Sequence, residues 1–306
     1  MLMIIFTLIF PYISTQTCLA TPGNIRFTHK TSKLKAGTSF LFQAASFHSG
    51  DRIHWSVSNP SLATINKSGK LTAKKVGTVN VTASCGNRKS TTKVTITPKK
   101  IIGIDAGHQK KGNSSLEPIG PGASKKKAKV SSGTQGVSTR VNEYELNLAI
   151  AKKLKSELEN RGYAVIMTRT KHNVNISNSQ RSKLLNDAGC DIAIRLHADG
   201  STNSKRTGAS ALYTSTSNPY VKKSVSKKSK TLAKNVLGAY CKKTKIKNNG
   251  IVVRDDLTGN NFSKIPTIVL EMGFMSNAKE DRNMQKSSTQ KNMVHGIANG
   301  IDQYFK

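Results

Sequence analysis

The sequence predicts an α/β domain, with a mixed or parallel sheet flanked by helices, preceded by a small all-β sandwich. Three observations support this. Residues 25–97 form short runs rich in valine, threonine and isoleucine, cut by Gly, Asn-Pro and Ser-Gly, which is typical of a β-sandwich. After residue 99, apolar runs alternate with amphipathic helical stretches, which indicates an α/β sheet. The length of 306 residues is sufficient for two such domains.

The first twenty residues predict a signal peptide. "MLMIIFTLIFPYISTQTCLA" is an apolar run followed by small and polar residues, with Ala20 at a plausible cleavage point. No basic residue precedes the run, and the run is too short to span a bilayer, which takes about 20 apolar residues. We therefore expect a signal peptide at 1–20, the β-sandwich at 21–98, the α/β domain at 99–306, and a mature chain that is secreted and has no transmembrane segment.

The chain is strongly basic. It contains 49 Lys and Arg against 16 Asp and Glu, a formal net charge of +33. Such a surface attracts nucleic acid, anionic lipid or an acidic polymer of a cell wall. The basic residues are spread along the whole chain, and no aromatic RNA-binding motif or paired zinc-finger cysteines accompany them. This favours a secreted protein on an anionic surface over a nucleic-acid binder. We also expect a monomer with no nucleic acid partner.

The β part contains a recognisable order of motifs. "IHWSVSNPSLATINKSGKLTAKKVGTVNVTAS" pairs a W-x-S-x-(S/N)-x-x-x-A pattern with G-x-(L/V)-x-A-x-x-x-G-x-(A/V)-x-(V/I)-x-A. This stretch resembles the bacterial immunoglobulin-like domain of group 2. The resemblance implies an extracellular spacer or adhesion module without catalysis, in which Trp55 is a core residue and not a platform for sugars.

The α/β part divides into clear elements. The strongest is the helix predicted over 143–160, where Leu146 and Ile150 begin an apolar repeat of four residues and Gly162 follows as a stop. The segment 109–141, with several glycine and proline breaks and the run "SKKKAK", predicts a long loop beside the site. The other expected helices span 178–188, 224–243 and 292–304, and the expected strands span 101–105, 164–169, 191–196, 209–213 and 267–271.

Two of these strands end in histidine. "IIGIDAGH" leads to His108 and "DIAIRLH" leads to His197. A single histidine in such a place is usually an ordinary strand-end residue, but ligand sites in α/β sheets lie at the carboxyl ends of the strands. Two histidines at one edge form a candidate pair of zinc ligands, and a hydrolytic zinc site needs a third protein ligand.

Carboxylates supply the remaining candidates. "VNEYELNLAI" offers Glu143 and Glu145 at a helix start; Asn142 and Glu145 fit a capping box, and Glu143 also suits a first helical turn for electrostatic reasons. "IPTIVLEMGFMSN" carries Glu271 to the end of a buried strand, where a carboxylate is costly without a partner. A general base beside a metal-activated water would explain that placement.

Taken in order, "IDAGH", "EYELNL", "RGYAVIMTRT", "QRSKLLNDAGCDIAIRLHADG", "PTIVLEMGFMSN" and "GIANGIDQYF" resemble the zinc-dependent N-acetylmuramoyl-L-alanine amidases of bacterial cell walls. The resemblance covers residues 101–306. It implies one Zn²⁺ per chain held by His108, Glu143 and His197, with Glu271 as the catalytic acid–base. It also suggests that Asp105 steers one of the ligands.

The resemblance implies hydrolysis of the amide bond between the lactyl group of N-acetylmuramic acid and L-alanine in peptidoglycan, with anionic wall polymers as further partners by charge. The family usually has Ser-Ile-His-Ala-Asn around its second histidine, whereas Arg195 and Asp199 flank His197 here. Two alternatives remain open: a zinc peptidase that cleaves stem peptides, and a catalytically idle protein that binds the wall.

Overall fold

The computed structural model describes residues 24–46 and 52–306. The described residues form two compact units, one drawn from residues up to 96 and the other comprising residues 97–306 together with 35–37 and 74–76. The signal peptide predicted at 1–20 lies outside the described residues. Among the described residues, no helix is both long enough and apolar enough to cross a membrane.

The first unit is all-β, as predicted. Its strands form a four-stranded sheet in the order β2-β9-β8-β5, a three-stranded sheet in the order β3-β7-β6, and the pair β1-β4. Trp55 packs between aromatic neighbours, with ring centroids 5.9 Å from Phe27 and 6.3 Å from Phe42, as expected of a core residue. The strands are β1 (Arg26–His29), β2 (Lys33–Lys35), β3 (Ser39–Leu41), β4 (Gln43–Ala45), β5 (His54–Val57), β6 (Ala63–Ile65), β7 (Lys70–Ala73), β8 (Gly77–Cys85) and β9 (Arg88–Thr97).

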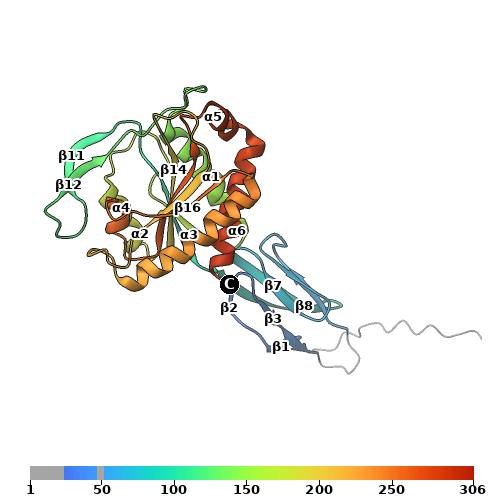
Figure 1. Ribbon diagram of the computed structural model, residues 1–306. Helices are drawn as coiled ribbons and strands as arrows, with labels where there is room; N and C mark the ends of the chain where they lie inside the picture. The colour runs from blue at the N-terminus through green and yellow to red at the C-terminus, as the bar shows by residue number, and fades with distance from the viewer. Residues whose placement is uncertain (1–23, 47–51) are drawn as a thin grey trace, which may run out of the picture. The chain divides into compact units, whose positions relative to one another are not determined.

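The second unit is built on a six-stranded mixed sheet, as predicted (Figure 1). The first four strands in spatial order run parallel, β15 is antiparallel to β17, and β16 is parallel to β15. In spatial order the strands are β13 (Ala164–Met167), β10 (Ile101–Ala106), β14 (Ile192–Asp199), β17 (Thr267–Phe274), β15 (Ala209–Tyr213) and β16 (Asn248–Val253). The helices are α1 (Glu143–Asn160), α2 (Asn178–Asp187), α3 (Lys223–Thr244), α4 (Thr258–Asn261), α5 (Ala278–Gln285) and α6 (Ser287–Tyr304).

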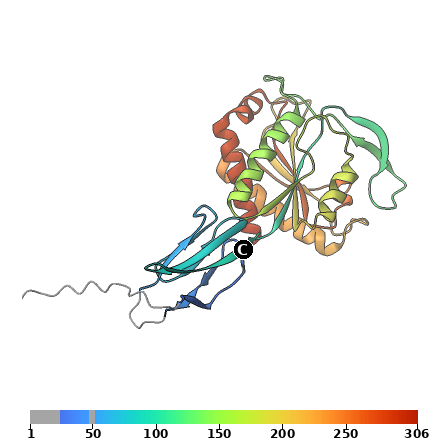
Figure 2. The same ribbon diagram turned by 180° about the vertical axis from the view of Figure 1, so that it is seen from behind.

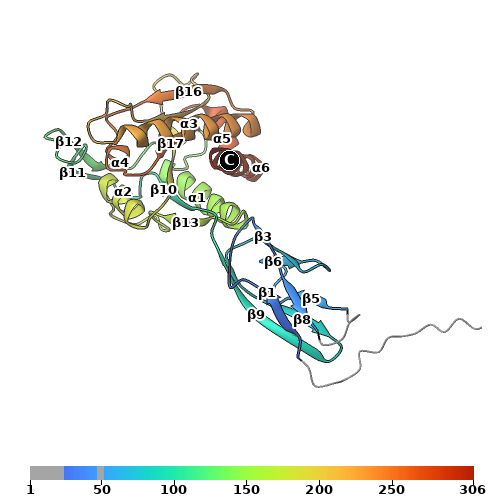
Figure 3. The ribbon, with the colours of Figure 1, turned by 90° about the horizontal axis from the view of Figure 1, so that it is seen from below.

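Successive side chains of the central strands point to opposite faces of the sheet and pack in different clusters. On β14, Ile194 and Leu196 join the main core with residues of α1, α3 and α6. Ala193, on the other face, packs with Leu185 of α2. Figure 3 shows α2 and α4 on one side of the sheet, with α1 and α6 on the other. Because both faces are covered, the strands are apolar runs that end in polar residues.

Helices α3 and α6 approach closely at two glycines. A Cβ atom added to Gly296 would lie 2.8 Å from Tyr240 Cα, and one added to Gly300 would lie 2.4 Å from Val236 Cα. Figure 2 shows α6 beside α1 from behind. The glycines of "GIANGIDQYF" thus allow the backbones of α6 and α3 to touch.

The segment 109–141 is not only a loop. It contains an antiparallel hairpin of β11 (Asn113–Pro118) and β12 (Lys126–Val130). Glu117 is buried and accepts hydrogen bonds from the N–H and hydroxyl of Ser179, in the first turn of α2. The prediction of a long loop was wrong for this part, because Asn113–Pro118 and Lys126–Val130 pair with each other as strands. β16, α4 and α5 were also not predicted.

A buried ion-pair network joins α2 to the sheet. The carboxylate of Asp105 is 1% exposed and accepts hydrogen bonds from Arg181 Nη1 at 2.8 Å, Arg195 Nε at 2.9 Å and Thr168 Oγ1 at 2.6 Å. Burial opposes ionisation, but the two guanidinium groups outweigh it and hold the pKa of Asp105 well below its usual range. The network therefore connects β10, β14 and α2 by charge.

We expect the two helix glycines Gly300 and Gly238 to respond in opposite directions to alanine. Gly300→Ala should lower the free energy of unfolding by about 1–3 kcal/mol, because its methyl group would overlap the backbone of α3. A Cβ at Gly238, also within α3, meets nothing within 4 Å, so Gly238→Ala should raise it by about 0.5–1 kcal/mol. Urea unfolding followed by far-ultraviolet circular dichroism measures both, and effects of the same sign would contradict this packing.

We expect Asp105→Asn to lower the free energy of unfolding by about 3–5 kcal/mol, because Arg181 and Arg195 would remain buried without their carboxylate. The folded pKa is lowered, so this stability is present above the unfolded pKa of about 4 and is lost as the pH falls below it. The wild type should therefore lose stability in acid more steeply than the variant. Asp187→Asn, at an exposed position of α2, is the control and should change stability by no more than about 0.5 kcal/mol.

Candidate metal centre

His108 lies two residues after the end of β10 and has a backbone φ of +60°, a left-handed conformation that few non-glycine residues adopt. Its Nδ1 lies 3.0 Å from the carbonyl oxygen of Ser131 and 3.0 Å from Ser131 Oγ. When Nδ1 carries the proton and donates it to that carbonyl, the lone pair of Nε2 is free on the other side of the ring. The strand end therefore presents one imidazole nitrogen in a fixed orientation.

Glu143 is the first residue of α1 and is 4% exposed. Its Oε2 accepts a hydrogen bond from the backbone N–H of Thr134 at 3.0 Å. Its Oε1 accepts from the backbone N–H of Ala198 at 3.1 Å and from Asn147 Nδ2 at 3.2 Å. The start of the helix also favours an ionised carboxylate at this position.

Glu145 has different surroundings. Its Oε2 accepts a hydrogen bond from the backbone N–H of Asn142 at 3.0 Å, and the two residues form the predicted capping box. The acid that caps the helix and the acid that faces the histidines are thus separate side chains.

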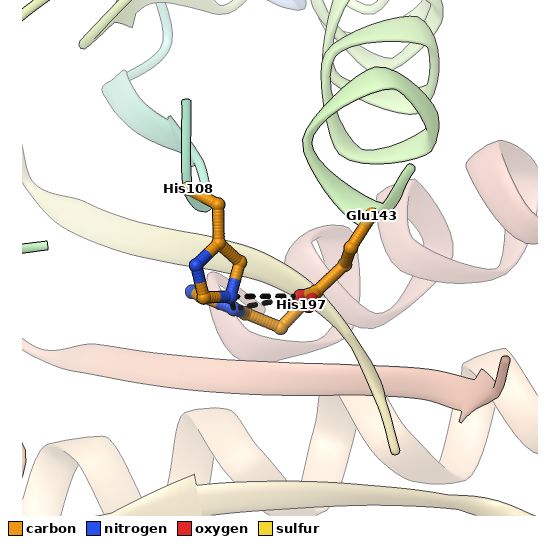
Figure 4. A group of neighbouring side chains, drawn as sticks. All are labelled: His108, Glu143 and His197. Carbon is orange, nitrogen blue, oxygen red and sulfur yellow. Dashed lines mark hydrogen bonds and ion pairs between the residues drawn. The ribbon is translucent and has the colours of Figure 1, made fainter. Parts of the chain in front are cut away.

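Three donor atoms converge at one point, as Figure 4 shows. His108 Nε2, His197 Nδ1 and Glu143 Oε1 lie 3.1 Å from one another in each pair, and the two rings are nearly perpendicular, at 81°. If His108 donates through Nδ1, its Nε2 and the Glu143 oxygen are two acceptors in contact, which is unfavourable without a cation between them. Donors of a tetrahedral zinc site, with bonds of about 2.0–2.2 Å, lie about 3.3 Å apart. The donor set fits a zinc ion.

Two glycines leave room for this arrangement. A Cβ at Gly107 would lie 2.4 Å from the ring of His197. Gly133 has a φ of +85°, and its Cβ would lie 2.7 Å from Glu143 Oε2 and 2.8 Å from His108 Cδ2. Any larger side chain at either position would displace a candidate ligand.

The electrostatics of the site favour the protonation states that bind metal. Burial lowers the pKa of His197 to about 4, so its imidazole is neutral at neutral pH. Burial opposes ionisation of Glu143, but the adjacent His108 and His197 outweigh it and hold the pKa of Glu143 well below its usual range. Neutral imidazole and ionised carboxylate are the forms in which these side chains bind a divalent metal.

Glu271 lies on β17, paired in register with His197 on β14. Burial and the nearby acids Glu143 and Asp199 raise the pKa of Glu271 well above its usual range. Its side chain lines a cavity of about 280 Å³ together with His108 and His197. The walls of the cavity include residues of the hairpin (Lys127, Ala128, Val130), of α2 (Asn178) and of the segment after β16 (Arg254, Leu257, Thr258).

Asp105 does not steer a candidate ligand directly, which corrects that expectation. Its carboxylate binds Arg181 and Arg195, and Arg181 in turn donates to the carbonyl oxygens of Ala106 and His108. Asp105 thus acts on the backbone that carries His108. Arg195, which departs from the usual family pattern, is the partner of this buried acid.

Sequence reasoning did not identify the buried arginines. Arg181 is 1% exposed and Arg169 is 3% exposed, and Arg169 donates to the carbonyl oxygens of Ala106, Gly107 and Tyr144. The sequence offers only a weak signal for their burial: Arg169 follows an apolar strand, and Arg181 lies in the first turn of a helix. Of the other histidines, His29, His54, His172 and His295 lie outside the cluster, and His48 lies outside the described residues.

The comparisons with known proteins agree with this geometry. A family profile described as N-acetylmuramoyl-L-alanine amidase matches residues 102–303, and one described as bacterial Ig-like domain (group 2) matches residues 23–101. None of the curated proteins compared with the chain matches it significantly.

Solved structures give the same result. The catalytic domain of CwlV, an N-acetylmuramoyl-L-alanine amidase from Bacillus (Paenibacillus) polymyxa var. colistinus, is 26% identical, with a TM-score of 0.54 over 67% of this chain and 98% of that one. An N-acetylmuramoyl-L-alanine amidase from Clostridium difficile 630 is 25% identical, with a TM-score of 0.55 over 68% and 98%. Ami1 from Mycobacterium abscessus, at 21% identity and a TM-score of 0.62 over 68% and 100%, shares the fold.

The profile match spans nearly all of the α/β unit, and the arrangement of the sheet and helices is shared with solved amidases. The chain therefore belongs to the N-acetylmuramoyl-L-alanine amidase family of peptidoglycan hydrolases, with a bacterial Ig-like domain of group 2 before its catalytic part.

Proposed function

We propose that the chain hydrolyses the amide bond between the lactyl group of N-acetylmuramic acid and L-alanine with one zinc ion held by His108, Glu143 and His197. The observation that supports this most strongly is the convergence of three donor atoms, each 3.1 Å from the others. When bound, zinc lowers the pKa of a water ligand to about 7 and polarises a carbonyl group.

Glu271 is the proposed proton carrier. It lies beside the candidate ligands in the same cavity and makes up part of its wall. Its raised pKa means that its carboxylate holds a proton more tightly than an exposed glutamate does. Such a group can take a proton from the attacking water and return it to the leaving nitrogen of the scissile amide.

Hydrogen bonds around His108 and Glu143 hold these proposed ligands in place during the reaction. Ser131 fixes the ring of His108, while the backbone N–H groups of Thr134 and Ala198 fix the two oxygens of Glu143. These contacts come from two separate segments of chain, the one between β12 and α1 and the end of β14. The site is therefore held by the fold and does not need to be assembled by the substrate.

The location and domain organisation belong to the same proposal. A peptidoglycan substrate and the net charge of +33 support a protein secreted to the wall, with residues 1–20 as a signal peptide and residues 21–98 as a spacer or anchor. Residues 99–306 are then the catalytic domain. Anionic wall polymers are the proposed additional partners.

Digestion of purified peptidoglycan with and without a chelator tests the reaction. We expect intact stem peptides to be released from muramic acid, this release to stop when the chelator is present, and added zinc to restore it. Mass analysis of the fragments distinguishes the alternatives. Shortened peptides would identify a peptidase, and a chain that binds the wall without releasing any fragment would be an idle binder.

Three glutamate variants test the assigned roles. Glu271→Gln should keep about one zinc ion per chain, by elemental analysis, and lose hydrolysis, because it changes the proton carrier and no proposed ligand. Glu143→Gln should lose both zinc and hydrolysis. Glu145→Gln should keep both and change stability by no more than about 1 kcal/mol, the usual scale of a helix cap.

Zinc titration into the chelator-stripped variants provides the measurement. Loss of the metal by Glu271→Gln would overturn its role as a proton carrier. Loss of the metal by Glu145→Gln together with retention by Glu143→Gln would show that the other acid is the ligand.

A further inference from the structure

Helix α3 carries an unusual concentration of positive charge. It contains seven lysines and no acidic residue. Its buried face, which includes Leu232, Val236 and Tyr240, belongs to the main core. Four exposed lysines, Lys223, Lys227, Lys230 and Lys234, follow one another at spacings of four, three and four residues. At 100° per residue these four lie within an arc of about 60°, and we call them the α3 lysine stripe.

The stripe is not neutralised by the protein. Among the described residues, none of the ion pairs involves a lysine of α3. Like charges at spacings of three and four residues destabilise a helix. Lys222 and Lys223 also lie at the N-terminus of α3, which has no acidic residue in its first turn and no side-chain cap, although the helix dipole disfavours cations there. Lysines that weaken their own helix and have no internal partner point to an external one.

The side chains of the α3 lysine stripe and their surroundings on the helix indicate which class of partner could bind there. Its charges are all lysine ammonium groups, which act as point charges and do not recognise planar groups by paired hydrogen bonds. The aromatic residue of α3, Tyr240, is buried, so the helix offers no platform for stacking nucleic acid bases. The apolar face of α3 is buried against the core, so it cannot insert into a membrane surface as an amphipathic helix does.

We propose that the α3 lysine stripe binds a linear phosphodiester polymer of the cell wall. The charges of the stripe rise along the helix in steps of about 4.5 to 6 Å, which suits a flexible chain with regularly repeated single negative charges. Such a polymer lies next to peptidoglycan, the substrate of this family. The cavity beside the candidate metal centre is lined by Arg195, His197 and Glu271, on the opposite face of the sheet from the core side chains that pack against α3. A polymer bound along α3 would therefore leave the cavity uncovered.

The test is co-sedimentation of the full chain with purified walls over a range of salt concentrations. The stripe variant is Lys227→Gln, Lys230→Gln and Lys234→Gln. The matched control is Lys152→Gln, Lys279→Gln and Lys291→Gln, three exposed lysines on other helices, so both variants have the same net charge. We expect the stripe variant to bind native walls on the order of tenfold more weakly at low salt, and the control to bind nearly as the wild type does.

Two further measurements separate this proposal from the proposed reaction. Walls stripped of their phosphodiester polymer should bind the wild type and the stripe variant equally. The stripe variant should also keep its zinc, its hydrolysis of a soluble muropeptide and a melting temperature at or above that of the wild type, because the substitutions remove repulsion within α3.

Several results would overturn the proposal. An equal loss of binding in the control would show that net charge alone determines attachment. Unchanged binding of the stripe variant to native walls would show that α3 is not the contact surface. Tighter binding of single-stranded DNA or of phosphatidylglycerol vesicles than of the wall polymer, with the same loss in the stripe variant, would assign the stripe to a different class of partner.

Discussion

Asp105 is the residue at which β10, β14 and α2 are joined by charge. A carboxylate that is 1% exposed is stable only when its charge is matched, and here Arg181 and Arg195 match it. Arg181 then donates to the carbonyl oxygens of Ala106 and His108. The backbone that turns at His108 in a left-handed conformation is thus held by a guanidinium group. Apolar packing could not do this, because buried carbonyl groups need donors. The orientation of the candidate ligand depends on the ion pair behind it.

Strand β14 shows how one segment serves both stability and chemistry. Its alternate residues Ile194 and Leu196 lie in the core with α1, α3 and α6, while Arg195 and His197 lie on the face that lines the cavity. A shift of one residue in register would exchange the two sets. The parallel pairing with β10 and β17 prevents this and sets His197 opposite Glu271. Burial of the apolar residues of the strand therefore determines where its alternate polar residues lie.

The α/β class and the main helices could be predicted because they depend on local patterns, whereas the full set of candidate site residues came from the family resemblance. The helix over 143–160 has the predicted bounds, since its apolar repeat and its capping box are both local signals. His108 and His197 were identified by a rule about strand ends. The partners of Asp105 could not be predicted, because Arg181 and Arg195 lie 76 and 90 residues away along the chain. The hairpin was missed for a related reason: "KKAKV" becomes a strand only when it pairs with Asn113–Pro118.

The excess of basic over acidic residues makes the surface positive, and several of the few acids lie inside the fold. Among the 16 acidic residues, Asp105, Glu117, Glu143 and Asp281 are buried. Glu117 and Glu143 accept hydrogen bonds from backbone N–H groups at 3.2 and 3.0 Å, and Asp281 accepts from those of Ser138 and Thr139, both at 2.8 Å. These acids stabilise segments that surround the candidate site and cannot neutralise lysines at the surface. A net positive surface weakens the folded state through self-repulsion, and on α3 that repulsion has no local remedy. An anionic wall polymer would relieve it, so attachment to the wall and stabilisation of the fold would follow from the same contact.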